Sequence, residues 1–360
     1  MDMDRLRPVI DTFSFERCKG GNQGFNRILI QLFGLMGHGK SSFINTCIFV
    51  WQDGEYQSWA KTDEECGGGH HGGLTMNRIP HKLTSNITLV DNRGLVTMNP
   101  YETGEIFAQL GNLLPLGKQV EWSRGFGLVD RIVDSEKTVK TSDFIVPVLV
   151  HSLKKTILPE ERADLKALLH TAKDLTGIFP IVVLTHKTFG NLVAVEYTFK
   201  EMGIERIFAF ENYTREDHFR TRGRHEEVLS FLKEVIRDAQ FRVEHQKRDP
   251  VKEMQERKQF VLNYVHEREL KMEQEHLGRK RALEQAIRKK KLQKQEEELE
   301  RERQRRRQAQ EDEERRLSEE FGKQRLVDQA RHEEEFRAQE ETIAKKPKRP
   351  RGIFGWRKKK

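Results

Sequence analysis

The sequence predicts an α/β fold: a doubly wound, mostly parallel sheet followed by a long charged α-helix. Over the first two thirds of the chain, short apolar runs typical of buried strands alternate with segments of helical periodicity. Such alternation favours a parallel sheet covered by helices. Between Pro250 and Pro347 there is no other proline, and only two glycines interrupt a run of helix-forming residues.

Five apolar runs are the expected strands, at residues 27–33, 87–90, 144–150, 178–184 and, more weakly, 206–210. Helices are expected between them, notably at 160–174 and at about 224–241, where apolar residues recur at helical spacing. The expected organisation is a flexible lead-in over residues 1–24, one α/β domain over 25–246, a charged helix over 250–344 and a polybasic tail over 345–360.

Charge is distributed unevenly along the 360 residues. Residues 345–360 contain nine Lys or Arg and no acidic residue, whereas residues 251–344 contain 24 basic and 24 acidic residues. The formal net charge of +8 therefore arises in the tail, and the α/β domain is close to neutral. No specific nucleic-acid partner is predicted, because the basic surplus lies outside the expected domain.

The cysteines and the apolar runs indicate the compartment. Cys18, Cys47 and Cys66 are an odd set without a disulfide spacing, which is typical of a reducing environment. The N-terminus does not resemble a signal peptide, and the longest apolar run, 144–150, is far shorter than the ~20 residues that span a bilayer. We therefore expect a cytoplasmic protein, with a nuclear or peripheral-membrane pool if the basic tail acts as an address.

The helix over 250–344 is expected to be stabilised by its own ion pairs. Ten acid-to-base pairs stand at i,i+4 in the order that favours a helix, among them Glu275–Arg279 and Glu302–Arg306. Leucines seven residues apart do not stay in one heptad frame, so no coiled-coil seam persists. We expect protein partners or self-association through 250–344, with the part before Leu299 packing on a partner or on the domain and the middle solvated.

The strongest functional signal matches G-x-x-x-x-G-K-[ST], directly after the first strand and before an apolar helix. In this motif, backbone N–H groups and the helix N-terminus cradle phosphates, the lysine contacts the β- and γ-phosphates, and the next hydroxyl is a Mg²⁺ ligand. The expected nucleotide-binding residues of this loop are Gly34, Gly37, His38, Gly39, Lys40, Ser41 and Ser42. The fold is therefore expected to be a P-loop nucleoside-triphosphatase of the G-domain type.

A second motif, Asp91-x-x-Gly94, follows the expected strand at 87–90. It places a carboxylate where it can hold the Mg²⁺ shell and a glycine whose N–H can meet the γ-phosphate. Lys40, Ser41, Asp91 and Gly94 are therefore the expected catalytic residues, with Ser41 and Asp91 as metal ligands.

With these motifs, residues 26–240 resemble the interferon-induced-protein-44-like and immunity-associated (GIMAP-class) GTPases. The resemblance rests on segments 39–45, 91–94, 182–187 and 210–213. It implies a GTP-binding switch or assembly factor with Mg²⁺ as cofactor, in an immune or interferon-type response. It also implies that Thr75 completes the Mg²⁺ shell as a catalytic residue. The base-side residues that it implies are Thr185, His186, Lys187, Glu211 and Asn212.

Two positions depart from the pattern of such GTPases. The guanine box N/T-K-x-D has Phe189 where an Asp accepts from the base, and Glu211 is the candidate replacement. Leu95 follows Gly94 where Ras-like enzymes carry a water-positioning glutamine. We therefore expect weakened guanine selectivity and slow hydrolysis, with His38 and the segment around His70 as candidates for the missing catalytic group.

Two alternative functions stay open. One is a nucleotide-binding scaffold that does not hydrolyse and whose helix organises partners. The other, with less support, is ATP-dependent phosphoryl transfer to a small molecule. A metal site at Cys66, His70 and His71 is disfavoured because three ligands are too few, and a glycine-rich switch loop is expected there.

The polybasic tail, 345–360, has three interpretations. It is a nuclear-import address, an anchor to an anionic membrane that is assisted by Phe354 and Trp356, or a solvated end. The sequence does not decide between an import receptor and a membrane surface as its partner.

Overall fold

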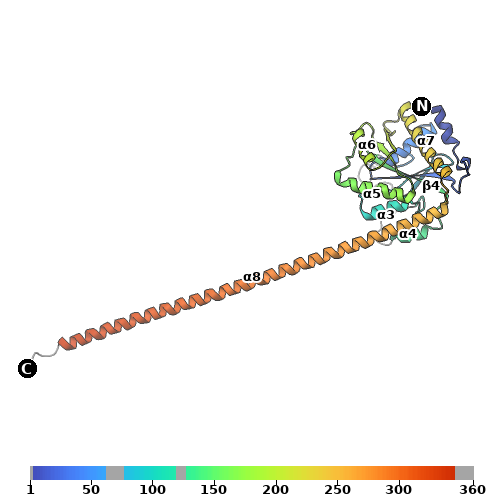
Figure 1. Ribbon diagram of the computed structural model, residues 1–360. Coiled ribbons are helices and arrows are strands. Elements are labelled where there is room, and N and C mark those ends of the chain that lie inside the picture. The colour runs from blue at the N-terminus through green and yellow to red at the C-terminus, as the bar shows by residue number, and fades with distance from the viewer. Residues whose placement is uncertain (1–2, 62–76, 119–126, 345–360) are drawn as a thin grey trace, which may run out of the picture. The chain divides into compact units, whose positions relative to one another are not determined.

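A computed structural model of the chain describes residues 3–61, 77–118 and 127–344 (Figure 1). The chain divides into two compact units, Met1–Glu273 and Gln274–Lys360. The first is an α/β unit built on a six-stranded sheet. Helix α8, Pro250–Ala344, begins in the first unit and forms the described part of the second.

The sheet has the strand order β2-β3-β1-β4-β5-β6 and is mostly parallel. β2 is antiparallel to β3, and the other neighbouring pairs are parallel. The strands are β1 (Arg27–Phe33), β2 (Ile79–Lys82), β3 (Ile87–Asp91), β4 (Asp143–Ser152), β5 (Ile181–Thr185) and β6 (Ile207–Phe210). The five predicted strands are confirmed within three residues at each end. The edge strand β2 was not predicted, because Pro80, His81 and Lys82 give it no apolar pattern.

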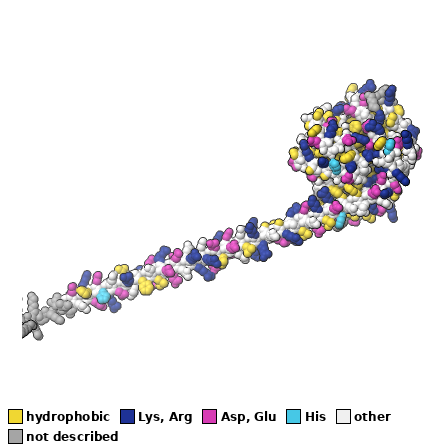
Figure 2. All heavy atoms as spheres, viewed as in Figure 1, with side chains coloured by type: hydrophobic (Ala, Val, Ile, Leu, Met, Phe, Trp, Pro, Cys, Tyr) yellow, Lys and Arg dark blue, Asp and Glu magenta, His cyan; other side chains and the backbone are white. Residues whose placement is uncertain are grey.

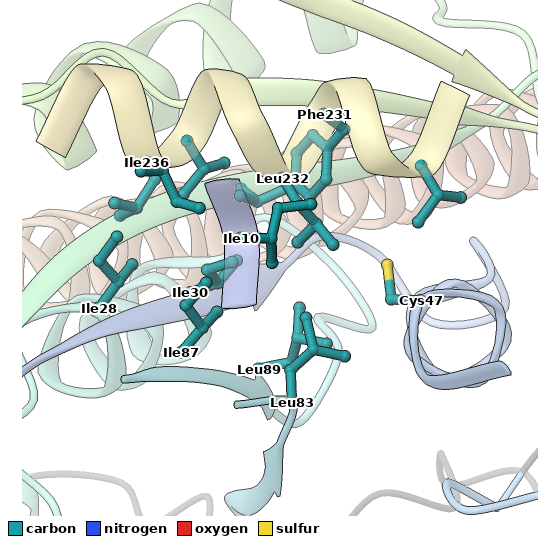
Figure 3. Packing of buried hydrophobic residues seen from close by; sticks show 14 of the residues in the cluster. Ile10, Ile28, Ile30, Cys47, Leu83, Ile87, Leu89, Phe231, Leu232 and Ile236 are labelled. Atoms are coloured by element: carbon teal, nitrogen blue, oxygen red, sulfur yellow. The ribbon is translucent and has the colours of Figure 1, made fainter. Parts of the chain in front are cut away.

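Helices cover both faces of the sheet, as the doubly wound prediction requires. One face packs against α1 (Met3–Asp11), α2 (Lys40–Gln52) and α7 (Arg222–His245). Figure 3 shows Ile28 and Ile30 of β1 facing Leu232 and Ile236 of α7 within this layer. The other face packs against the start of α8 and against α3 (Pro100–Leu110), α4 (Gly127–Ser135), α5 (Pro159–Thr176) and α6 (Leu192–Glu201).

Helix α5 shows how local sequence sets the ends of an element. It begins at Pro159, whose fixed φ suits the first helical position, and ends before Gly177, which is left-handed with φ 70°. Leu165, Leu168 and Leu169 share its buried face, as predicted.

The N-terminal segment differs from the flexible lead-in predicted for residues 1–24. Leu6 and Ile10 of α1, and Phe15 beyond it, are buried in the same core as α7. Arg7 donates a hydrogen bond of 2.6 Å to the carbonyl oxygen of Val50 at the end of α2. The segment is ordered because these few apolar side chains are buried against α7, although they are too few to form a recognisable pattern.

Helix α8 belongs to both units, so the first unit extends beyond the boundary predicted at residue 246. Met254, Val261 and Val265 are buried in the core of the first unit. Farther along, acidic and basic side chains intermingle on its surface (Figure 2). The i,i+4 pair Glu302–Arg306 forms with a distance of 2.9 Å. Among the described residues, no helix is long and apolar enough to cross a membrane.

Candidate functional site

The glycine-rich loop joins β1 to α2 at the carboxyl end of the parallel strands, the edge where ligands bind in such sheets. Its three glycines, Gly34, Gly37 and Gly39, have φ values of 134°, 71° and 87°. Gly39 is the left-handed N-cap of α2, and a Cβ there would lie 3.2 Å from Thr185 Oγ1. Because Gly39 has no side chain, the loop can pass close to Thr185 and enter α2 in this left-handed conformation. The free N–H groups at the N-terminus of α2 favour an anion.

Lys40 is the buried cation of this loop, with 7% of its surface exposed. Its Nζ donates to the carbonyl oxygens of Gly34 at 3.3 Å and Leu35 at 3.0 Å. Gly94 of the second motif lies against the same ammonium group, since a Cβ on Gly94 would be 2.7 Å from Lys40 Nζ. The two motifs therefore meet at Lys40, and a side chain at position 94 would displace the Lys40 ammonium group.

Ser41 and Asp91 form the second contact between the motifs. The Ser41 hydroxyl donates to Asp91 Oδ2 at 2.8 Å, and Asp91 is 1% exposed. Mg²⁺ prefers oxygen ligands in an octahedral arrangement, of which a protein commonly supplies one or two while phosphates and water supply the rest. The Ser41 hydroxyl and the Asp91 carboxylate are close enough together to be those two. Within the described ranges no cluster of three or more His, Cys, Asp or Glu could hold a metal ion. Ser41 and Asp91 would supply two oxygen ligands, which fits Mg²⁺ that takes its other ligands from phosphate and water.

A buried arginine, Arg78, is hydrogen-bonded to the Asp91–Gly94 loop. Arg78 is 0% exposed, and its Nε donates to Asn92 Oδ1 at 3.1 Å. Its Nη2 donates to the carbonyl oxygen of Gln109 at 3.0 Å. Burial lowers the pKa of Arg78 to about 9, which leaves it protonated at neutral pH. No sequence motif marks Arg78, because its partners are distant in the chain.

The backbone of Leu95 is hydrogen-bonded to the glycine-rich loop, and its side chain is buried. It is 1% exposed, its N–H donates to Gly34 O at 3.1 Å, and its carbonyl oxygen accepts from Met36 N at 2.8 Å. Its side chain is apolar as well as buried, so it has no polar group to position a water molecule.

His38, a candidate for the missing catalytic group, has its side chain buried next to His151. The ring centroids are 4.9 Å apart, and His38 is 4% exposed. Burial, with smaller effects of nearby positive groups, lowers the pKa of His38 to about 3, and burial lowers the pKa of His151 to about 4. His38 is therefore neutral at pH 7, and its Nδ1 accepts from Ser152 N at 3.4 Å. It positions the loop and supplies no positive charge there.

The predicted base-side residues lie at the ends of β5 and β6, next to the glycine-rich loop. The Thr185 hydroxyl donates to the carbonyl oxygen of His38 at 2.9 Å. His186 is left-handed with φ 56°, and its Nδ1 is hydrogen-bonded to Ser152 Oγ at 2.9 Å. Lys187 forms an ion pair with Glu227 of α7. Thr185 therefore links the loop to β5, and His186 links the end of β5 to β4. The Lys187 ammonium is paired with α7.

Glu211 and Asn212 follow β6 at the same edge. One carboxylate oxygen of Glu211 accepts from Thr188 N at 2.9 Å and from Thr188 Oγ1 at 2.8 Å. Asn212 is 8% exposed, and its Oδ1 has no hydrogen-bond partner in the described part of the chain. Its Nδ2 lies 3.5 Å from the position of a Cβ on Gly39. Phe189 is 49% exposed beneath Lys154 Nζ, 4.6 Å from its ring centroid.

Thr75, a predicted metal ligand, lies outside the described residues, and so do Cys66, His70 and His71 of the disfavoured metal site. Among the described residues, the structure brings together Lys40, Ser41, Asp91 and Gly94, and it places Thr185, His186 and Asn212 beside the loop.

No model of a known protein family matches the chain, and no curated protein matches it significantly.

Proposed function

We propose that this chain binds GTP with Mg²⁺ and hydrolyses it slowly, acting as a switch or assembly factor. The observation that carries the proposal is the 2.8 Å contact of Ser41 with Asp91, beside Lys40 and Gly94. Two motifs from separate strands meet there in the arrangement that triphosphate binding requires. Ser41 and Asp91 would hold Mg²⁺, which supplies positive charge against the phosphates, and Lys40 would neutralise their remaining charge.

The base-side residues support a guanine nucleotide. Guanine differs from adenine in carrying N1–H and a 2-amino group, both hydrogen-bond donors that need acceptors. Asn212 Oδ1, with no partner among the described atoms, is one acceptor beside the loop, and the Glu211 carboxylate is another. Because Glu211 already accepts two bonds from Thr188, we expect a weaker preference for GTP over ATP than a dedicated Asp provides.

Lys40→Ala tests the site. We expect it to weaken GTP binding at least about 100-fold, or ~2.7 kcal/mol, because the phosphates lose their buried cation. Titration with a fluorescent GTP analogue in Mg²⁺ measures this, and competition with ATP measures the base preference. The control is Lys166→Ala, the same substitution at an exposed position of α5. Equal GTP affinity in Lys40→Ala and the parent, with unchanged circular dichroism, would disprove the site.

The apolar Leu95, at the position where a polar residue would orient water, favours a second candidate, a nucleotide-binding scaffold that does not hydrolyse. Single-turnover conversion of bound GTP to GDP separates the two. For the switch we expect a rate on the order of 10⁻⁴ s⁻¹, comparable to intrinsic rates without an activating arginine. GTP that stays intact for days at 25 °C, in protein that binds it tightly, would select the scaffold.

The connection from the second motif to α8 supports a switch that acts through the helix. Glu102 of α3 accepts hydrogen bonds from Val96 N at 2.6 Å and Thr97 N at 3.1 Å. On the next residue of α3, Thr103 Oγ1 is hydrogen-bonded to Tyr264 Oη of α8 at 3.0 Å. A change in the loop after Gly94 would therefore reach α8 through α3. Protein partners or self-association through 250–344 remain part of this proposal.

A further inference from the structure

Asn92 anchors the Asp91–Gly94 loop through both ends of its side-chain amide. It is 0% exposed, and its Nδ2 donates to Gln31 Oε1 at 2.8 Å and to the carbonyl oxygen of Leu32 at 3.0 Å, both in β1. Its Oδ1 accepts from Arg78 Nε at 3.1 Å. The amide is therefore held from two sides, by the strand that leads into the glycine-rich loop and by Arg78.

Arg78 is held in turn by the carboxyl-terminal end of α3. Its Nη2 donates to the carbonyl oxygen of Gln109 at 3.0 Å and to Asn112 Oδ1 at 3.3 Å. Its Nη1 donates to the carbonyl oxygen of Leu114, which follows the end of α3. The guanidinium group therefore bridges the end of α3 and the Asp91–Gly94 loop, and its planar fork fixes the geometry between them.

The surroundings of Arg78 favour a role in geometry over a role in packing alone. Its hydrogen-bond acceptors among the described residues are all neutral oxygens, and Asp143 offsets the cost of burial without a hydrogen bond to it. A buried charge without a bonded carboxylate costs free energy, and an apolar side chain would fill the same space at a lower cost. Unlike an apolar side chain, the guanidinium group supplies a directed hydrogen bond to Asn92.

The contacts of the candidate nucleotide site lie on either side of Asn92. Asp91, directly before it, accepts from Ser41 at 2.8 Å, and Gly94, two residues after it, lies against Lys40 Nζ. Because the three residues share a short stretch of backbone, a shift of Asn92 would displace both contacts. Groups that orient the ligands of a metal ion typically change its affinity by about 10–100-fold when they are removed.

We propose that Arg78 is a positioning residue of the candidate Mg²⁺ site, which acts through Asn92 and holds Asp91 in place for the metal ion. Arg78 belongs to neither motif and acts at one remove from the ligands. The inference rests on the proposed function. It adds a residue that determines how much Mg²⁺ contributes to nucleotide binding.

The Mg²⁺-dependent gain in GTP affinity tests the proposal. This gain is the ratio of the dissociation constants of a fluorescent GTP analogue, measured on the full chain in EDTA and in Mg²⁺. We expect Arg78→Lys to reduce the gain about tenfold, because lysine cannot donate to Asn92 and to α3 together. Its affinity in EDTA should stay within about twofold of the parent, since Lys40 and the glycine-rich loop are unchanged. A loss of folded protein would remove sites in both conditions and leave the ratio unchanged.

Further variants separate the role of Arg78 from general effects on the fold. Asn92→Ala leaves Arg78 in place and should reduce the gain as Arg78→Lys does. The double variant should lose no more than Asn92→Ala alone, because Arg78 acts through Asn92. Arg27→Lys is the matched control, since Arg27 donates two hydrogen bonds to Asp143, at 2.7 and 3.1 Å, and is not hydrogen-bonded to the loop among the described residues. Its gain should stay within about twofold of the parent.

The outcomes distinguish this inference from the proposed function. A gain in Arg78→Lys or in Asn92→Ala equal to that of the parent would overturn the inference alone, and so would fully additive losses in the double variant. A parent chain that binds the GTP analogue no better in Mg²⁺ than in EDTA would overturn the proposed function, and this inference with it.

Discussion

At the residue scale, the His38–His151 contact determines how the glycine-rich loop responds to acid. The exposed fractions of the two side chains are 4% and 6%, and burial holds their pKa values near 3 and 4. In an unfolded chain both would titrate near ~6.5. The folded protein therefore binds fewer protons than the unfolded chain as the pH falls below that value.

The free energy of unfolding should fall with the pH in this range. Each histidine with a lowered folded pKa stabilises the fold fully above ~6.5 and loses that contribution as the pH approaches the folded pKa. Between pH 7 and 5.5 we expect a loss of about 2–3 kcal/mol from the two histidines together. Urea unfolding at both pH values measures it. His151→Asn should remove about half of the drop, whereas the exposed His276→Asn should not. An unchanged drop in His151→Asn would contradict this account.

The phosphate motifs and Arg78 show which residues of the site a sequence can predict. The motif residues are predictable because phosphate chemistry fixes their spacing within short segments, and their strands meet at one edge of the sheet. Arg78 has no such pattern: its guanidinium group donates to Asn92 Oδ1 and to the backbone carbonyl oxygen of Gln109, which are 14 and 31 residues away. The role of Glu211 in holding Thr188 is hidden for the same reason, since 23 residues separate them.

At the element scale, the start of α8 explains why the predicted domain boundary was too early. Pro250 does begin the helix, as its fixed φ favours. The next turns nevertheless bury Met254, Val261 and Val265 in the α/β unit. Composition could not reveal this, because similar apolar residues continue along α8 after the buried ones end.

Two truncations separate the parts of α8. A chain ending at residue 273 should keep the free energy of unfolding of the α/β unit within about 1 kcal/mol, since it keeps the buried turns. A chain ending at residue 249 should lose several kcal/mol, because burial of each large apolar side chain contributes about 1.5–3 kcal/mol. Urea unfolding, monitored by tryptophan fluorescence, measures both. Equal stability of the two chains would show that the first turns of α8 do not support the domain.

Farther along α8, six of the eleven large exposed apolar residues from Leu270 to Phe336 fall into a repeat that a heptad frame does not detect. These six recur at offsets of 0 or 7 within an 11-residue period: Leu270, Leu277, Leu292, Leu299, Phe321 and Phe336. An 11-residue period matches about 3.67 residues per turn, so these positions stay on one face of a nearly straight helix. The pairs Leu270/Leu277 and Leu292/Leu299 therefore do not share one heptad frame, although they lie on the same face of the helix. Any helix that packs along this face would pair with a slight right-handed supercoil.

At the scale of the whole molecule, the net positive charge and the candidate nucleotide site lie in different parts of the sequence. The site lies in a unit of nearly balanced charge, and the helix beyond it carries equal numbers of basic and acidic residues over 251–344. The nine basic residues of 345–360 supply the net charge, and they lie outside the described residues. Localisation and nucleotide binding should therefore be separable by deletion.

Deletion of residues 345–360 should change the localisation of the protein, either its binding to anionic membranes or its nuclear accumulation. It should leave the nucleotide affinity within about twofold, or ~0.4 kcal/mol. Each basic side chain contributes about 1 kcal/mol near an anionic surface, so binding should be collective and should weaken with salt. Flotation with phosphatidylserine vesicles, and imaging of nuclear accumulation, measure the two destinations.

A double substitution of Phe354 and Trp356 by Ser separates the mechanisms of the tail. It removes the aromatic side chains that would sit at a membrane interface and keeps every basic residue, which an import receptor would bind. Weaker vesicle binding with unchanged nuclear accumulation would indicate a membrane anchor. Nuclear accumulation that depends on the tail, without vesicle binding even at low salt, would indicate an import address. If the truncated chain distributes like the full chain and the full chain does not bind vesicles, the tail does neither and is a solvated end.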